Sequence, residues 1–105
     1  MNLFQSLFGK GETTDLKSII EQGAFLVDVR TAAEFAGGHV KGSVNIPLNN
    51  IPTQLAKFRN KKNIIVFCRS GGRSSQAKTI LEQNGFTNVV NGRTWDHVNK
   101  FIQDR

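Results

Sequence analysis

Cysteine is the residue whose scarcity says most about this chain: among 105 residues there is one, Cys68. A single cysteine excludes an internal disulfide, a Cys-X-X-Cys redox pair and a zinc site built on cysteines. Any chemistry at Cys68 must therefore use one thiol, as a nucleophile or as a carrier of sulfur. A lone thiol suits a reducing compartment, and no signal-peptide core is recognisable, so we expect a cytoplasmic protein.

Long apolar runs and acidic residues are also in short supply. No segment approaches the roughly 20 apolar residues of a membrane span, so we predict no membrane insertion. Eight Asp and Glu residues against 14 Lys and Arg residues give a net charge of +6, which favours anionic partners. The basic stretch at residues 57–62 has only Phe58 between its charges, and we therefore predict no nucleic-acid binding.

The length of the chain fits one compact domain, because domains usually have ~100 to 200 residues. Hydrophobic residues make up 38% of the sequence, which is enough for one core. We assign residues 1–10 to a short N-terminal segment, with Phe4, Leu7 and Phe8 at helical spacing, and residues 11–105 to a single domain. We expect this domain to be a monomer.

Strand and helix patterns alternate along the chain. The predicted strands are 24–29, 43–46, 63–68 and 87–90, and the first and third of these are continuous apolar runs typical of strands buried on both faces. The predicted helices start at 13 or 14 and end near Gly23, and then cover 31–36, 50–58, 73–84 and 95–102. This alternation predicts an α/β fold, in which a parallel sheet carries helices on both faces and ligands bind where the strands end.

The loop after strand 63–68 places polar and flexible groups around Cys68. It contains Arg69, Ser70, Gly71, Gly72, Arg73 and Ser74. The two glycines permit a turn whose backbone N–H groups point inward, and the following helix adds the positive end of its dipole. These groups and the two arginines favour an anion and lower the pKa of a thiol below its usual ~8.5. We therefore predict a thiolate nucleophile in an anion-binding loop.

Two kinds of chemistry fit an activated cysteine in such a loop. A cysteine phosphatase loop encloses a phosphoryl group above the sulfur, whereas a sulfurtransferase loop encloses only the sulfur and one transferred sulfur atom. Four residues separate Cys68 from Arg73, one fewer than in cysteine phosphatases, and Phe67 stands where those enzymes usually have His. The shorter ring favours sulfur transfer, with a cysteine phosphatase or arsenate reductase as the less favoured alternative.

The segment Cys68-Arg69-Ser70-Gly71-Gly72-Arg73-Ser74 resembles the C-R-x-G-x-R-S loop of the rhodanese superfamily, in particular of its small single-domain, phage-shock-type members. A second block agrees in order and spacing: Asp28-Val29-Arg30, Glu34-Phe35, Gly38-His39-Val40, Gly42-Ser43 and Asn45-Ile46-Pro47. The resemblance runs from about Thr13 to the C-terminus. It implies a three-layer, rhodanese-like sandwich whose central, mostly parallel sheet has about five strands, the first of them near 11–13.

The resemblance also implies an activity. The thiolate of Cys68 would attack the outer sulfur of thiosulfate, release sulfite and hold a persulfide, which cyanide, a small thiol or a protein thiol would then accept. Arg69 would help to orient the thiosulfate anion, and the loop amides would stabilise the persulfide. No cofactor is implied. A sulfur-relay or protein-binding module with little turnover of small molecules is the main alternative.

Five further residues are candidates for supporting roles: Asp28, Arg30, Glu34, His39 and Trp95. Transfer through a thiolate needs no separate acid or base, so we interpret Asp28 and Glu34 as scaffold groups that pair with Arg30 or Arg73. His39 has no second ligand at metal-binding spacing, and we predict no metal site. Trp95 either lines the mouth of the site or packs in the core.

Three positions depart from the family pattern. Gly72 stands where single-domain members often have Asn, and Ser70 stands where some thiosulfate-specific members have Lys. Asn91-Gly92 replaces a Gly-Gly pair. We expect Asn91 to preserve this turn, because Asn tolerates left-handed backbone better than most residues.

Overall fold

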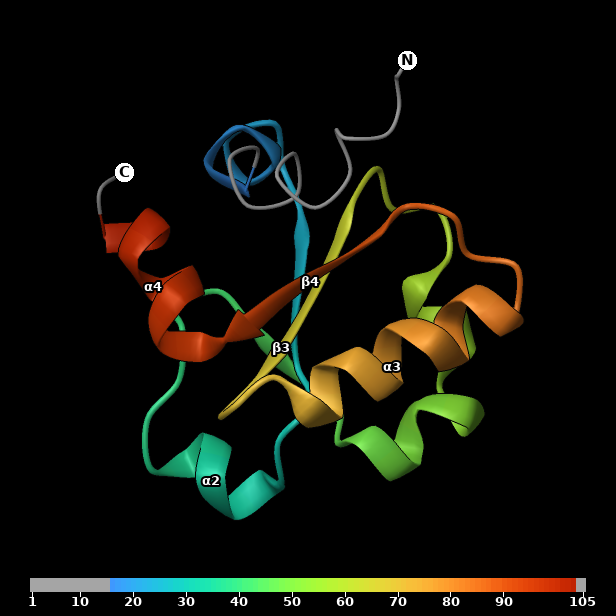
Figure 1. Cartoon of the computed structure of the whole chain (residues 1–105), viewed down its shortest axis with the longest axis horizontal. Helices are drawn as coiled ribbons and strands as arrows, with labels where there is room; N and C mark the ends of the chain where they lie inside the picture. Colours follow the sequence, from blue (N-terminus) through green and yellow to red (C-terminus); the bar gives the residue numbers. More distant parts are fainter. Residues whose placement is uncertain (1–15, 104–105) are drawn as a thin grey trace.

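Four parallel strands form the centre of the computed structural model, which describes residues 16–103. They are β1 (Phe25–Asp28), β2 (Val44–Asn45), β3 (Ile64–Cys68) and β4 (Val89–Thr94), and their order in the sheet is β2-β1-β3-β4. All neighbouring pairs are parallel, so the carboxyl ends of the strands meet at one edge (Figure 1). The predicted parallel sheet is confirmed. The strand expected near 11–13 and the segment 1–10 lie outside the described residues.

Helices cover both faces of this sheet (Figure 1). On one face lie α3 (Gly72–Gln83) and the 3-10 helices η1 (Leu48–Thr53) and η2 (Leu55–Phe58). On the other face lie α4 (Trp95–Gln103) and the helical residues 16–21. A short helix, α2 (Ala32–Ala36), follows the carboxyl end of β1. Within residues 16–103, no helix is long and apolar enough to cross a membrane.

The strand β3 separates two apolar cores. All five of its residues are buried. Ile64, Val66 and Cys68 belong to the core under α3, whereas Ile65 and Phe67 belong to the core under α4. A strand that is buried on both faces requires a continuous apolar run, which is the pattern that predicted it. The same alternation directs the Cys68 side chain to the α3 side of the sheet.

The chain between β2 and β3 differs from the single helix predicted over 50–58. It forms the two 3-10 helices η1 and η2, which are separated at Gln54, where φ is −124°. Pro47 gives η1 no side-chain cap, and Pro52 inside η1 has no N–H to donate. The predicted core contacts are nevertheless present, since Ile51 and Phe58 are buried.

The strand β4 is longer than the strand predicted over 87–90, because it continues through Asn91 and Gly92 to Thr94. Its register against β3 shifts after Asn91, which leaves Gly92 as the extra residue of a bulge. A Cβ at Gly92 would lie 2.7 Å from Val98 Cγ2 and 2.9 Å from Ile65 Cγ2, so glycine is required there. The left-handed turn expected at Asn91 is wrong: the left-handed residue is Arg93, with φ of 71°.

Candidate functional site

Cys68 lies at the carboxyl end of β3, on the edge of the sheet where the strands end. None of its surface is exposed (0%). Residues 69–71 turn back toward it before the chain enters α3, and the Gly71 N–H donates a hydrogen bond to Sγ at 3.0 Å. A sulfur donor or acceptor must therefore approach the sulfur past this loop.

Although the Cys68 sulfur is buried, it has polar groups within hydrogen-bonding distance. Besides the Gly71 N–H, the hydroxyl of Ser74 lies 3.7 Å from Sγ. Burial alone raises the pKa of the thiol, but hydrogen bonds from the backbone and hydroxyl of Ser74 and from the backbones of Gly71 and Ser70 outweigh this effect. The pKa of Cys68 is therefore lowered, and the thiolate is favoured.

The two glycines of the loop, Gly71 and Gly72, have different structural roles. Gly71 has φ of 102°, in the left-handed region that favours glycine, and it immediately precedes α3. In this conformation the Gly71 N–H donates its hydrogen bond to Cys68 Sγ. Gly72 is the first residue of α3, and a Cβ added to it would meet no atom within 4 Å. Only Gly71 is thus required by the backbone.

Ser74 connects the loop to the end of β4. It is buried, and its hydroxyl oxygen lies 3.0 Å from the carbonyl oxygen of Gly71 and 3.4 Å from that of Arg93, so its single proton is available to either carbonyl or to Sγ. The left-handed backbone of Arg93 is held by Asn91, whose Oδ1 accepts the Arg93 N–H at 2.8 Å. Sequence reasoning missed Arg93. The one available signal was Asn two residues earlier, since Asn commonly accepts a hydrogen bond from the backbone two residues on.

Replacing Ser74 with Ala is expected to raise the pKa of Cys68, because it removes the hydroxyl beside Sγ and keeps the backbone N–H. The chain has a single cysteine, so the rate of alkylation by iodoacetamide against pH reports this thiolate alone. The midpoint of that profile should move to higher pH in Ser74→Ala. Ser75→Ala, at an exposed position of α3, is the matched control. Equal midpoints in wild type and Ser74→Ala would contradict this role of the hydroxyl.

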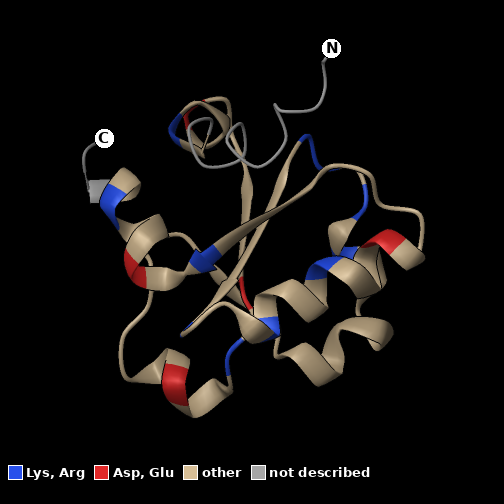
Figure 2. Cartoon of the chain, viewed as in Figure 1, with Lys and Arg blue, Asp and Glu red and all other residues tan. Residues whose placement is uncertain are grey.

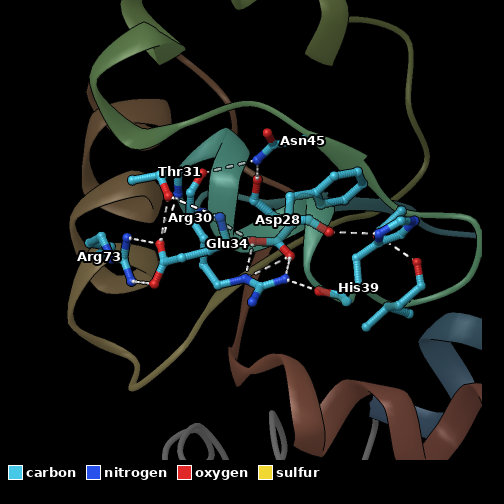
Figure 3. Close-up of polar contacts among 11 residues, drawn as sticks. Asp28, Arg30, Thr31, Glu34, His39, Asn45 and Arg73 are labelled. Carbon is cyan, nitrogen blue, oxygen red and sulfur yellow. Dashed lines mark hydrogen bonds and ion pairs between the residues drawn. The ribbon is translucent and has the colours of Figure 1, made fainter.

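Glu34 joins α2 to the start of α3 (Figure 3). Arg73 donates to its two carboxylate oxygens at 2.7 and 3.1 Å, and the N–H and hydroxyl of Thr31, the N-cap of α2, donate to Oε1. The Arg73 hydrogen bonds first, and then those from Thr31, lower the pKa of Glu34 from 4.5 to about 2. The stability that this contact contributes is complete above pH 4.5 and is lost as the pH falls toward 2. Arg73 therefore holds the loop against α2.

Asp28 and Arg30 form a second, buried ion pair beside the first (Figure 3). Asp28 is 0% exposed and accepts the Arg30 Nη2 at 2.7 Å and Nε at 2.9 Å. The same Nη2 donates to the carbonyl of Gly38 at 2.7 Å, and Asn45 donates to the carbonyls of both paired residues. The pair fixes the end of β1 against the turn after α2. Of the pairings considered from the sequence, the structure contains Asp28 with Arg30 and Glu34 with Arg73.

His39 contacts only its own turn among the interactions of the described residues. Its Nδ1 lies 2.9 Å from the carbonyl of Phe35, and its ring stacks on the Phe35 ring at 3.8 Å between centroids. The structure does not place it in contact with the Cys68 loop. In the described part of the chain, no three His, Cys, Asp or Glu side chains are grouped as metal ligands.

An open cavity of about 480 Å³ lies beside the loop, bordered by α2, Arg30, Arg69 and the first two residues of α4, Trp95 and Asp96. Trp95 is half-buried: it packs against the core under α4, and the Arg30 guanidinium lies 4.7 Å from the centre of its ring. Trp95 thus borders the cavity and also packs against the core, which are the two alternatives that the sequence left open. Arg69 and Ser70 are exposed, and the Arg69 guanidinium has no ion pair or hydrogen bond among residues 16–103.

Comparison with known proteins assigns this arrangement to a family. The family model described as "Rhodanese-like domain" matches residues 12–92 of this chain. The chain belongs to the rhodanese-like domain family. The resemblance of the chain to the rhodanese superfamily is therefore confirmed, and the protein is grouped with the rhodanese-family sulfurtransferases.

Two curated proteins are similar to much of this rhodanese domain. A sulfurtransferase of Allochromatium vinosum is 36% identical over 72 residues, which are 69% of this chain and 67% of that protein. The thiosulfate sulfurtransferase PspE of Escherichia coli is 39% identical over 67 residues, which are 62% of this chain and 64% of that protein. Each match therefore covers about two thirds of the relative's length.

A solved structure described as "rhodanese with anions from E. coli" resembles this domain closely. It aligns with a TM-score of 0.65 at 34% identity, over 71% of this chain and 91% of that chain. The likeness confirms the rhodanese-like α/β fold expected from the sequence.

Proposed function

We propose that this protein is a thiosulfate sulfurtransferase that carries sulfur on Cys68. The Cys68 thiolate attacks the outer sulfur of thiosulfate, the S–S bond of thiosulfate breaks, and its electron pair leaves with sulfite. Cys68 then holds a persulfide. Cyanide or a thiolate attacks the outer sulfur of this persulfide, the bond from Sγ to that sulfur breaks, and the Cys68 thiolate is restored.

The observation that supports this proposal most is the hydrogen bond of 3.0 Å from the Gly71 N–H to Sγ. It lies in a loop whose N–H groups lower the pKa of Cys68, and the same groups suit the negative charge of a persulfide. Arg69 is the cation of the loop that is left to meet an anionic donor, because Arg73 is paired with Glu34. The name of the similar protein PspE refers to this same reaction.

The close contact at the sulfur also disfavours the phosphatase alternative. The short ring between Cys68 and Arg73 closes on the sulfur itself, with an amide nitrogen 3.0 Å from Sγ. A phosphatase loop must instead hold its amides around a phosphoryl group bound above the sulfur. A thiolate that carries one extra sulfur atom needs much less space than a bound phosphoryl group.

The proposed sulfur transfer also requires a reduced thiol, which agrees with the cytoplasmic location predicted from the sequence.

Incubation with thiosulfate is expected to add one sulfur atom to the protein, measured by intact mass. Cyanide should then remove that atom and yield thiocyanate. Protein alkylated beforehand with iodoacetamide is the control and should gain nothing, because its only cysteine is blocked. An unchanged mass after thiosulfate, or an equal gain in the alkylated protein, would rule out the mechanism.

A sulfur-relay module is the second candidate, and the complete burial of Cys68 is the observation that favours it. A sulfur that is covered by its own loop would be reached more readily if a partner protein displaced that loop. This alternative predicts rapid loading from a protein persulfide and negligible turnover with thiosulfate and cyanide. The rates of these two reactions distinguish the candidates.

A further inference from the structure

The cavity beside the Cys68 loop contains four charged groups, and two of them already have partners. Arg30 is paired with Asp28, and Glu34 is paired with Arg73. The other two, Arg69 and Asp96, are exposed, and neither has an ion pair or a hydrogen bond among the described residues. The cavity therefore offers one available positive charge and one available negative charge.

These two charges come from different parts of the fold. Arg69 directly follows the reactive cysteine, and Asp96 is the second residue of α4. Figure 2 shows acidic segments on α2 and near the start of α4. The half-buried Trp95 and the turn at Gly38 also line the cavity, and they lie close together, since a Cβ added to Gly38 would be 3.5 Å from Trp95 Cη2. A volume of about 480 Å³ holds a molecule of amino-acid to small-peptide size.

We propose that this cavity binds the sulfur acceptor, and that the acceptor is a zwitterionic thiol whose carboxylate meets Arg69 and whose ammonium group meets Asp96. The proposal rests on the persulfide mechanism above and names the acceptor class for it. A dianion such as thiosulfate has no group for Asp96, and neither does the cyanide anion. Asp96 thus distinguishes the acceptor from the donor.

The transfer step needs no further reactant. The acceptor thiolate attacks the outer sulfur of the Cys68 persulfide, a new S–S bond forms, and the bond to Sγ breaks with its electron pair returning to Cys68. The transferred sulfur keeps its negative charge, so the product is the persulfide anion of the acceptor. Sulfite has left before the acceptor enters, so Arg69 is free to serve both substrates in turn.

The test measures the second half of the reaction alone, in the full chain loaded at Cys68 with inorganic polysulfide. The rate of sulfur removal is followed by intact mass with cysteine and with N-acetylcysteine, which lacks the ammonium group. In Asp96→Asn the rate ratio of cysteine to N-acetylcysteine should fall about two- to fivefold, the size of an exposed ion pair. Asp96→Lys should lower it further, and Asp96→Glu should restore most of it. Comparing ratios cancels the different intrinsic reactivities of the two thiols.

Glu21→Gln is the matched control, because it removes one exposed carboxylate from a helix at the opposite end of β1. It should keep the wild-type ratio. An unchanged ratio in both Asp96→Asn and Asp96→Lys, or an equal fall in Glu21→Gln, overturns the proposal. Selectivity for cysteine in a protein that takes no sulfur from thiosulfate would support this acceptor site and refute thiosulfate as the donor, so the two ideas fail separately.

Discussion

Replacing Cys68 with Ser is expected to lower thiosulfate:cyanide sulfur transfer by a factor on the order of 10³ or more, as removal of a nucleophile does in other enzymes. A serine hydroxyl is not ionised near pH 7 and does not form a persulfide, so the carrier atom itself is lost. No other thiol in the chain can replace it. The measurement is the rate of thiocyanate formation.

The control must separate lost chemistry from a disturbed core, because Cys68 is wholly buried in the core under α3. Circular dichroism and urea unfolding of Cys68→Ser and Cys68→Ala establish whether each variant is folded. Ser75→Ala, on the exposed side of the first turns of α3, should retain wild-type turnover. A folded Cys68→Ser protein with more than about a tenth of wild-type turnover would exclude Cys68 as the carrier.

Those parts of the fold whose determinants are local could be predicted from the sequence. The apolar run of β3 predicted a strand buried on both faces. The helix predicted over 95–102 is α4, which follows Thr94, whose Oγ1 accepts the His97 N–H at 3.2 Å. The region 50–58 could not be predicted as well. Its apolar spacing fits an α-helix, but Pro52 and the break at Gln54 divide it into two 3-10 helices that bury the same side chains.

The site shows the same division between local and distant determinants. The loop from Cys68 to Ser74 is contiguous, so its glycine turn, helix start and charges could be inferred together. The sequence proposed partners for Glu34 without choosing among them, because Arg73 lies 39 positions away and the choice depends on how α2 meets α3. The position of the left-handed residue at the end of β4 depends on the bulge at Gly92, which exists only when β4 is paired with β3.

Replacing Asp28 with Ala is expected to lower the free energy of unfolding by about 3–5 kcal/mol. The change leaves Arg30, a residue that is 4% exposed, without the carboxylate that accepts its Nε and Nη2. An unpaired charge in such a site is far more costly than an absent ion pair. The double variant Asp28→Ala, Arg30→Met removes both charges and should recover part of the loss. Urea unfolding of both proteins measures the two differences.

The surface pair of the half-buried Lys78 and the exposed Glu82 provides the comparison, with Nζ and Oε2 3.9 Å apart on one face of α3. Glu82→Ala should cost no more than about 1 kcal/mol, because solvent screens both charges. If Asp28→Ala costs no more than Glu82→Ala, the buried pair does not hold the end of β1. If it costs several times more, sulfur loading should fall together with stability, because β1 lies directly beside β3 and carries the chain into α2, whose Glu34 holds Arg73 of the loop.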